Sequence, residues 1–240
     1  MIIAVMPAYN EEKTIGRIIR ETRKYVDKII VVDDGSKDAT AQIAKKADAL
    51  VVKHEVNKGL GMSIRTGLAE ARRYNPDIII TIDADGQHDP KDIPKFVDKV
   101  KQGYDFVLGS RDLRAYPFIK KVGNFFLNFL TNLVCGTALM DTESGFRAFS
   151  RRALKKIKLQ GERYEIAADI IFQVGKHELR ACNVPIKSPR YIRGKGVTVG
   201  DGFRNFLYLI RRRKRSLKDY WYDLRYVVRH MARKYRNKTD

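Results

Sequence analysis

The residues Ile79-Ile80-Thr81-Ile82-Asp83-Ala84-Asp85-Gly86-Gln87-His88 decide the fold, because a buried strand ends there in two carboxylates. The apolar and β-branched run 78–82 is typical of a strand covered on both faces of a sheet. Two oxygen ligands at alternate positions suit Mg²⁺ or Mn²⁺, which would keep waters and take further ligands from a diphosphate. Taken alone, an Asp-x-Asp has another interpretation, in which Asp85 only caps a turn through Gly86.

Similar apolar runs alternate along the chain with longer segments of helical period, which predicts an α/β fold of parallel strands covered by helices. The predicted strands are residues 2–6, 28–32, 49–53, 78–82 and 106–109. The predicted helices are residues 12–25, 38–47, 59–74 and 91–101, with Asp38 and Asp89 as caps. Ligands of such sheets bind at the carboxyl ends of the strands, so the residues that follow each strand are the candidate site.

After Arg111 the alternation stops. Residues 122–140 are predicted to be a helix in which Asn124, Asn128 and Asn132 form a polar stripe on one face, so the helix is amphipathic and does not span a membrane. A loop at 141–147, a helix near 164–176 and a strand near 180–186 follow. We expect one domain over residues 1–200 and a basic helical tail over residues 201–240.

Composition limits the classes of function. The chain has 240 residues with 48 basic and 28 acidic side chains, a net charge of +20, which favours nucleotides, nucleic acid or anionic lipid as partners. With 44% hydrophobic and 32% charged residues, it is not a disordered protein. Cys135 and Cys182 lack metal-ligand spacing, which predicts reduced thiols in a cytoplasmic protein. The N-terminal residues lack the features of a signal peptide and are expected to form the first strand.

Three further segments identify a resemblance. They are Pro7-Ala8-Tyr9-Asn10-Glu11, Val31-Val32-Asp33-Asp34-Gly35-Ser36 and Asn57-Lys58-Gly59-Leu60-Gly61. In this order, and with the Asp-x-Asp segment, they resemble the family 2 glycosyltransferases, in particular dolichyl-phosphate mannose synthases and related polyprenyl-phosphate enzymes. The likeness extends from Ile2 to about Thr198. It implies the GT-A fold, a Rossmann-like sheet that binds a nucleotide sugar, with a nucleotide and metal half at 1–111 and an acceptor half at 112–200.

The resemblance also implies roles for individual residues. The residues expected to hold the nucleotide sugar are Pro7, Ala8, Tyr9, Glu11, Val32, Asp34, Asp83 and Ala84, with Asp34 accepting a hydrogen bond from a ring N–H. Asp85 is implied to be catalytic, and the Mg²⁺ or Mn²⁺ ligands are Asp83, Asp85 and Gln87. Two alternatives stay open: Tyr9 packs over the sheet, and Asp34 forms an Asx turn with Ser36. His88 is expected to support a ligand or a turn rather than to bind metal.

The acceptor half carries Gly109-Ser110-Arg111 and the segment 141–147, which resemble motifs of the lipid-phosphate branch. In that branch two arginines and a serine hold the acceptor phosphate, and the matching residues are Arg111, Lys120 and Asn124. Arg111 is also implied to be catalytic. Because lysine is a point charge where arginine is a bidentate fork, the phosphate would be held more loosely, or Lys121 would contribute.

The family's late basic motif is matched by Arg193, implied to be catalytic, but Val199 stands where the family has a lysine, and Lys195 is the candidate replacement. The surrounding glycines favour a lid over the diphosphate, with a plain flexible loop as the alternative.

The expected reaction is inverting transfer of a hexose from a nucleotide diphosphate sugar, of the GDP-mannose or UDP-glucose type, to dolichyl or polyprenyl phosphate. A phosphate monoester with a second pKa of about 6 needs positioning more than deprotonation. Asp141 and Glu143 are the candidate bases if the acceptor is a hydroxyl of a saccharide or another soluble molecule. Nucleic acid is not an expected partner, since no binding motif accompanies the charge.

The tail combines basic residues with an apolar stripe of Leu217, Trp221, Leu224, Val228, Met231 and Tyr235. Such a helix lies in an anionic headgroup layer, which predicts peripheral attachment at the cytoplasmic face of a membrane. The alternative is that the stripe packs on the catalytic domain or on a membrane-embedded partner.

Overall fold

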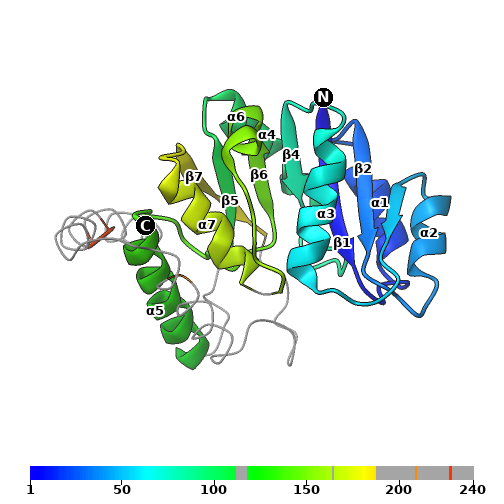
Figure 1. Ribbon diagram of the computed structural model, residues 1–240, viewed down its shortest axis with the longest axis horizontal. Coiled ribbons are helices and arrows are strands. Elements are labelled where there is room, and N and C mark those ends of the chain that lie inside the picture. Colours follow the sequence, from blue (N-terminus) through cyan, green and yellow to red (C-terminus); the bar gives the residue numbers. More distant parts are fainter. Residues whose placement is uncertain (112–117, 164, 188–208, 210–226, 229–240) are drawn as a thin grey trace.

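The apolar runs of the sequence form a seven-stranded sheet with strand order β3-β2-β1-β4-β6-β5-β7 (Figure 1). The computed structural model describes residues 1–111, 118–163, 165–187, 209 and 227–228, apart from the side chains of residues 118–122 and 124. The strands are β1 (Ile2–Ala8), β2 (Lys28–Asp33), β3 (Leu50–Lys53), β4 (Ile78–Thr81), β5 (Phe106–Arg111), β6 (Arg147–Ser150) and β7 (Ala181–Ile186).

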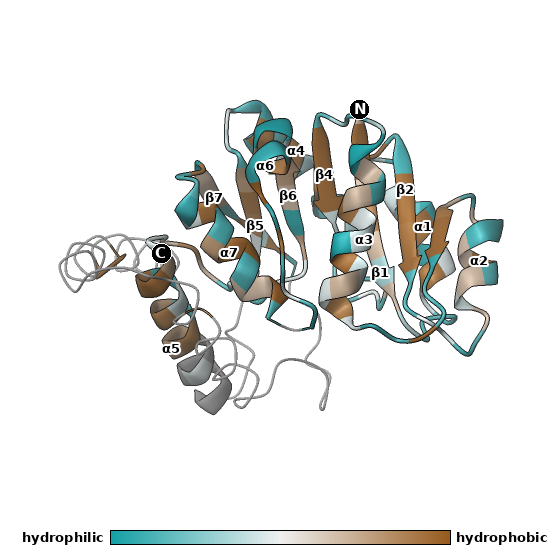
Figure 2. Ribbon diagram, viewed as in Figure 1, coloured by the Kyte–Doolittle hydropathy of each residue, from teal (hydrophilic) through white to brown (hydrophobic). Residues whose placement is uncertain are grey.

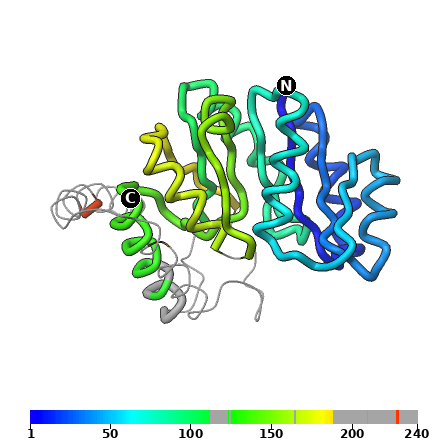
Figure 3. Tube along the Cα trace, in the orientation of Figure 1, coloured from blue at the N-terminus to red at the C-terminus, as the bar shows by residue number. Residues whose placement is uncertain are grey.

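Strand direction brings the chemically active segments together. β1 pairs in parallel with β2 and β4, β2 with β3, and β5 with β7, whereas β6 is antiparallel to both β4 and β5. The carboxyl ends of the six parallel strands and the first residue of β6 therefore lie at the same edge. Figure 3 shows β1, in dark blue, within the sheet rather than at its margin.

Helices cover both faces of this sheet. Apolar residues of α1 (Ile15–Thr22), α2 (Thr40–Lys46) and α4 (Ile93–Lys101) belong to the hydrophobic cluster on one face. Those of α3 (Leu60–Arg72), α5 (Phe118–Cys135), α6 (Arg151–Lys156) and α7 (Ile166–Lys176) belong to the cluster on the other face. A 3₁₀ turn, η1 (Pro90–Asp92), precedes α4.

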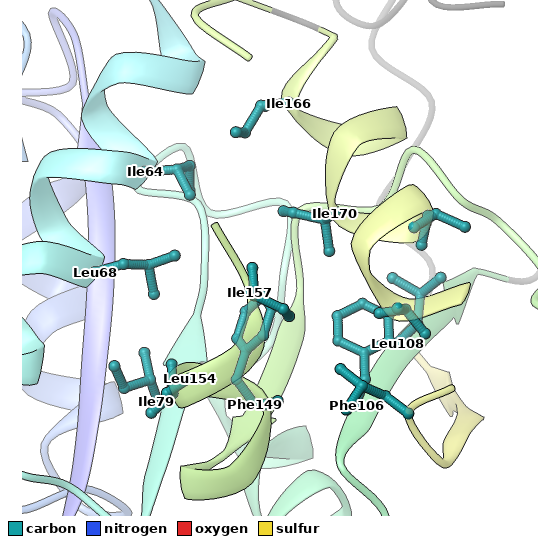
Figure 4. Packing of buried hydrophobic residues seen from close by; sticks show 14 of the residues in the cluster. Ile64, Leu68, Ile79, Phe106, Leu108, Phe149, Leu154, Ile157, Ile166 and Ile170 are labelled. Carbon is teal, nitrogen blue, oxygen red and sulfur yellow. The ribbon is translucent and has the colours of Figure 1, made fainter. Parts of the chain in front are cut away.

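The two clusters follow from the alternation of side chains along each strand. In β1, Ile3 and Val5 join one cluster while Ala4 and Met6 join the other, and all four are wholly buried. Figure 2 shows the strands as hydrophobic along most of their length. Figure 4 shows Ile64 and Leu68 of α3 facing the sheet, on the same side as Phe149 of β6 and Ile170 of α7. Each fully buried isoleucine or leucine contributes about 1.5–3 kcal/mol.

The predicted α/β class is confirmed, as are the strands at β1, β2, β3, β4, β5 and β7. Two elements were not predicted, namely β6 and the short helix α6. Asp89 caps η1 by accepting the Lys91 N–H at 3.0 Å. Asp38 accepts the Thr40 N–H at 3.0 Å, one residue before the N-cap of α2. Strands from the nucleotide half and from the acceptor half share one continuous sheet, with β6 inserted between β4 and β5.

Two members of the asparagine stripe of α5, Asn128 and Asn132, point inward. Asn128 and Asn132 are buried, at 2% and 0% exposure, whereas Phe125 and Phe126 are 47% and 57% exposed. Asn132 donates to the carbonyls of Asn128 and Leu139 and accepts from Thr137 Oγ1 and the Leu139 N–H, all at 2.7–2.8 Å. The helix is amphipathic as expected, but its polar face binds the following loop. In the described part of the chain, no helix is long and apolar enough to cross a membrane.

Of the tail, only Leu209, Val227 and Val228 lie within the described residues, so the predicted helix over 201–240 lies almost wholly outside them. Leu209 and Val227 are fully buried and Val228 is 51% exposed.

Candidate active site

The residues with candidate roles gather at the carboxyl edge of the sheet. Asp34 directly follows β2, Asp83 lies two residues after β4, Arg111 is the last residue of β5, and Arg147 is the first residue of β6. Thr81 and Arg147 are register partners in the β4–β6 pair, so the Asp83 segment and Arg147 come from adjoining strand ends. The two motifs that sequence spacing placed far apart therefore meet at one edge.

Hydrogen bonds join the loop after β1 to the loop after β2. The N–H of Asn10 donates to Ser36 Oγ at 2.9 Å, the N–H of Lys37 donates to Asn10 Oδ1 at 2.9 Å, and the N–H of Glu11 donates to Thr40 Oγ1 at 2.8 Å. These hydrogen bonds lie directly after Tyr9, and Tyr9 itself is 43% exposed. An exposed aromatic ring held by rigid loops is suited to stacking on a base.

The other residues predicted around the base are less accessible. Pro7 and Ala8 are buried within β1. Val32 is fully buried, and a Cβ added at Gly67 of α3 would lie 3.2 Å from its Cγ2. The side chain of Val32 therefore packs beneath α3, and the residue is near the carboxyl edge of the sheet only because it is the last but one residue of β2.

The Asp34 carboxylate accepts three hydrogen bonds from the segment between β3 and α3. Its Oδ1 accepts His54 Nδ1 at 2.7 Å and the Lys58 N–H at 2.9 Å, and its Oδ2 accepts the Gly59 N–H at 2.8 Å. The proposed Asx turn involves its neighbour instead, since the Ser36 N–H donates to Asp33 Oδ1 at 3.2 Å. The alternative interpretation of Asp34 as the turn residue is therefore wrong.

Asp83 is held between His88 and Gly145. His88 Nε2 donates to Asp83 Oδ2 at 3.2 Å, which is the supporting position expected for this histidine. Thr81 Oγ1 donates to the Gly145 carbonyl at 2.8 Å, and a Cβ on Gly145 would overlap with the Asp83 carboxylate. Burial raises the pKa of Asp83, but the hydrogen bond and charge of His88, with Arg147 and Arg111, lower it overall. Asp83 is therefore ionised at neutral pH.

Asp85 and Gln87 lie on a tight turn. Asp85 Oδ1 accepts the Gln87 N–H at 2.9 Å, and Gly86 has a φ of +79°, a conformation that favours glycine. The turn of the alternative interpretation thus exists, and both Asp85 and Gln87 are half-buried in it. In the described residues no three His, Cys, Asp or Glu side chains form a metal cluster. The donor set of two carboxylates and an amide oxygen fits Mg²⁺ or Mn²⁺ completed by water and diphosphate oxygens.

Arg111 and Asp141 form a bidentate ion pair. Arg111 Nε donates to Asp141 Oδ2 at 2.7 Å, Nη2 donates to Oδ1 at 2.6 Å, and the Arg111 backbone N–H donates to Oδ2 at 3.0 Å. Burial raises the pKa of Asp141, but the charge and hydrogen bonds of Arg111 lower it overall. A carboxylate that is held in this way is a poor general base, so the candidate role of Asp141 as a base is not favoured.

Two residues with clear places in the site had no assigned role in the sequence. Arg147 is 2% exposed, and burial, together with the charge of Arg111, lowers its pKa overall although Asp83, Glu143 and Asp141 raise it. Its only sequence signal is its position at the end of the 141–147 motif. His54 was not singled out, although it lies only three residues before the Asn57–Gly61 motif. The side chains of Lys120 and Asn124, and the whole of Arg193, lie outside the described residues.

Comparison with known proteins identifies relatives along most of the chain. Residues 3–158 match the family described as glycosyl transferase family 2. An uncharacterised protein of Methanocaldococcus jannaschii is 46% identical over 87% of this chain and 90% of that protein. A UDP-N-acetylglucosamine–dolichyl-phosphate N-acetylglucosaminyltransferase of Methanococcus voltae is 37% identical over 88% of this chain and 95% of that protein. The structure resembles glucosyl-3-phosphoglycerate synthase of Mycobacterium tuberculosis, solved with Mn²⁺, UDP-glucose and phosphoglyceric acid, with a TM-score of 0.71 at 22% identity, covering 87% of this chain and 79% of that one.

Proposed function

The chain belongs to glycosyl transferase family 2 and has the GT-A fold, and from these premises we propose that it transfers a hexose from a nucleotide diphosphate sugar to dolichyl or polyprenyl phosphate. The donor is of the GDP-mannose or UDP-glucose type, and the anomeric configuration inverts. A dolichyl-phosphate acceptor is named for the Methanococcus voltae relative, and the basic side chains of the site support the same acceptor class here.

The donor nucleotide is assigned to the edge formed by β1, β2 and β4. Tyr9 stacks on the base, Asp34 accepts from a ring N–H, and Asp83 faces the ribose. Glu11 lies on the loop after β1, where its backbone N–H donates to Thr40 Oγ1. The exposure of Tyr9 and the cross-linked loops support this assignment, because loops that are already ordered lose less conformational entropy on binding.

The diphosphate is assigned to the turn at residues 83–87. Asp83, Asp85 and Gln87 would hold Mg²⁺ or Mn²⁺, which supplies charge neutralisation for the departing diphosphate. His88 and Gly145 fix the Asp83 carboxylate, and the lowered pKa keeps it ionised. The lid predicted at Arg193 would close over this turn.

The observation that carries the proposal is the bidentate Arg111–Asp141 pair close to Asp83. Inverting transfer to an alcohol requires a base, and pairing with Arg111 removes Asp141 from that role, which leaves Glu143 as the remaining candidate base. A phosphate monoester needs cations and no base, and Arg111 and Arg147 supply positive charge at this edge. Lys120 and Asn124 are proposed to complete the phosphate site. The basic tail is proposed to hold the enzyme at the cytoplasmic face of a membrane, where such lipids reside.

The test is a donor panel with three acceptors. GDP-mannose, UDP-glucose and UDP-N-acetylglucosamine are incubated with dolichyl phosphate, with a soluble saccharide or with 3-phosphoglycerate, in Mg²⁺ or Mn²⁺. Labelled product in the lipid phase with one donor is the expected result. Product only with the saccharide or 3-phosphoglycerate overturns the lipid acceptor while leaving the family assignment intact.

The metal assignment is tested by Asp85→Ala. This substitution removes a ligand from a half-buried turn and no core packing, so we expect loss of transfer with an unchanged melting temperature. Near wild-type transfer at saturating metal would overturn the assignment.

A further inference from the structure

His54 is the only side chain among the described residues that hydrogen bonds to the Asp34 carboxylate. The other two donors are the backbone N–H groups of Lys58 and Gly59, at the start of α3. His54 donates from Nδ1 to Oδ1 at 2.7 Å, the shortest of the three contacts. The orientation of Asp34 therefore depends on one imidazole ring and one loop.

The imidazole ring is itself held at both ends. Its residue follows β3, and its backbone N–H donates to the Asp33 carbonyl at 2.9 Å. Nε2 lies 3.0 Å from Thr66 Oγ1 on α3, and the residue is only 7% exposed. The contacts connect β2, β3 and α3 through one side chain, at the point where the base is proposed to bind.

The direction of these hydrogen bonds follows from the chemistry of the groups. A carboxylate only accepts, so Nδ1 carries the hydrogen, and in the neutral ring Nε2 accepts from the Thr66 hydroxyl. A carboxylate offers about four acceptor positions, of which three are used, two on Oδ1 and one on Oδ2. The position that remains is on Oδ2, and it can only receive a donor.

We propose that His54 is a positioning residue for base selection: it fixes Asp34 so that Oδ2 meets a ring N–H of the donor's base. This inference rests on the proposed function, in which Asp34 contacts the base. Uracil at N3 and guanine at N1 present such an N–H, whereas cytosine and adenine present a bare nitrogen acceptor there. A fixed acceptor therefore favours uridine or guanosine donors and repels the other two.

The test compares two substitutions that each place an amide N–H donor near the position of one of the two ring nitrogens. His54→Asn places an amide N–H near the position of Nδ1, whereas His54→Gln places it near Nε2. Titration calorimetry of the full chain with Mn²⁺ measures the Kd of UDP, CDP, GDP and ADP. We expect wild type to prefer UDP over CDP, or GDP over ADP. His54→Gln should reduce that ratio about tenfold, and His54→Asn should keep most of it.

The ratio separates positioning from stability, because a merely structural defect weakens both nucleotides of a pair equally. An equal loss for both, or an unchanged ratio in His54→Gln, overturns the inference while the proposed function stands. If wild type shows no preference in either pair, the base contact of Asp34 itself is wrong. If His54→Gln fails to fold, Thr66→Val releases only the far end of the ring, and a smaller fall in the same ratio is expected; no fall overturns the inference.

Discussion

At the scale of single residues, the site depends on Gly145, because the lack of a side chain at this position leaves room for the Asp83 carboxylate. Gly145 lies against the Asp83 carboxylate, and its carbonyl is fixed by Thr81 Oγ1 at 2.8 Å. A methyl group at this position would overlap with the carboxylate. Asp83 follows β4 and Gly145 precedes β6, and because these two strands are paired, the backbones cannot separate and the Asp83 side chain would have to turn away. The absence of a side chain is thus what allows Asp83 to stay at the sheet edge.

Gly145→Ala is therefore expected to reduce transfer at least about tenfold and to raise the metal concentration needed for half-maximal rate. Gly123→Ala is the matched control, since a Cβ at Gly123 meets nothing within 4 Å. Its helical position should make that variant slightly more stable, by up to about 1 kcal/mol. Initial rates across a Mn²⁺ series and thermal melts of both variants provide the measurement. Equal rates in the two variants would show that Asp83 does not need its present position.

Arg111 gives the second prediction at this scale. Arg111→Ala should raise the KM for lipid phosphate far more than the KM for the nucleotide sugar, because its guanidinium is proposed to hold the acceptor. Arg111→Lys keeps the positive charge and loses the bidentate geometry of the guanidinium, so its KM for lipid phosphate should lie between those of wild type and Arg111→Ala. Steady-state kinetics with each substrate varied in turn decide the matter. An equal rise in both KM values would place Arg111 at the donor diphosphate instead.

At the scale of elements, α5 uses its polar stripe to order the loop that carries Asp141. Asn128 Oδ1 accepts the N–H and the hydroxyl of Thr142, both at 2.8 Å, and Asn132 holds the turn at Leu139. Asp141, with a φ of +56°, lies between these two anchors and pairs with Arg111. The helix therefore acts on the site through backbone contacts of the loop.

Asn132→Ala is expected to lower the free energy of unfolding by about 2–4 kcal/mol, because it leaves buried groups at Leu139 and Thr137 without their partner. Phe126→Ser, on the 57% exposed side of the same helix, should change it by about 0.5 kcal/mol or less. Urea unfolding of both variants measures the difference. Comparable losses in the two variants would mean that the asparagine stripe does not hold the loop.

The sequence predicted those elements whose apolar period is unambiguous. β1 begins with the apolar residues Ile2 to Met6 and β4 with three consecutive isoleucines, a pattern typical of buried strands. β6 was not predicted, because its four residues, Arg147 to Ser150, carry no distinctive period and are buried by β4 and β5 on either side. The stripe of α5 was recognised from spacing, but spacing cannot tell which face of a helix contacts the protein.

The site was predictable where a motif carries its own residues, as at Asp83 to Gln87. It was not predictable where a residue acts through the fold. His54 contacts Asp34 and Thr66 because β3 pairs with β2 and α3 packs on β2, a relation that no local pattern encodes. The same holds for Arg147, which approaches Asp83 through the pairing of β4 with β6.

At the scale of the whole molecule, the two halves of the domain cannot act separately. β6, from the acceptor half, lies between β4 and β5 of the nucleotide half and begins at the edge where both of those strands end. The carboxylates proposed for the donor and the cations proposed for the acceptor are thereby brought to one edge. Any disturbance of β6 is expected to affect both substrates.

The tail is proposed to bring this edge to the lipid. Deleting residues 212–240 should release the protein from anionic liposomes and leave donor binding unchanged, because the nucleotide and metal motifs all precede Thr198. Leu209, a member of the hydrophobic core, is retained by this deletion, but the fully buried Val227 is lost. The triple substitution Arg225→Gln, Arg229→Gln and Arg233→Gln keeps Val227 and removes only charge, so it separates membrane binding from folding.

Two neighbouring valines of the tail differ in exposure. Val228, which belongs to the apolar stripe, is 51% exposed, while Val227 is buried. If the tail is a helix that inserts its apolar stripe and presents its basic face, its binding to anionic vesicles should weaken as the salt concentration rises but should not disappear. Adsorption by charge alone would disappear at high salt. Co-sedimentation of wild type, the deletion and the triple variant with neutral and anionic vesicles across a salt series distinguishes these outcomes. If the deletion variant still sediments fully, the exposed phenylalanines of α5 become the candidate membrane-binding residues. If wild type never sediments with vesicles, the tail is expected to bind a protein partner instead.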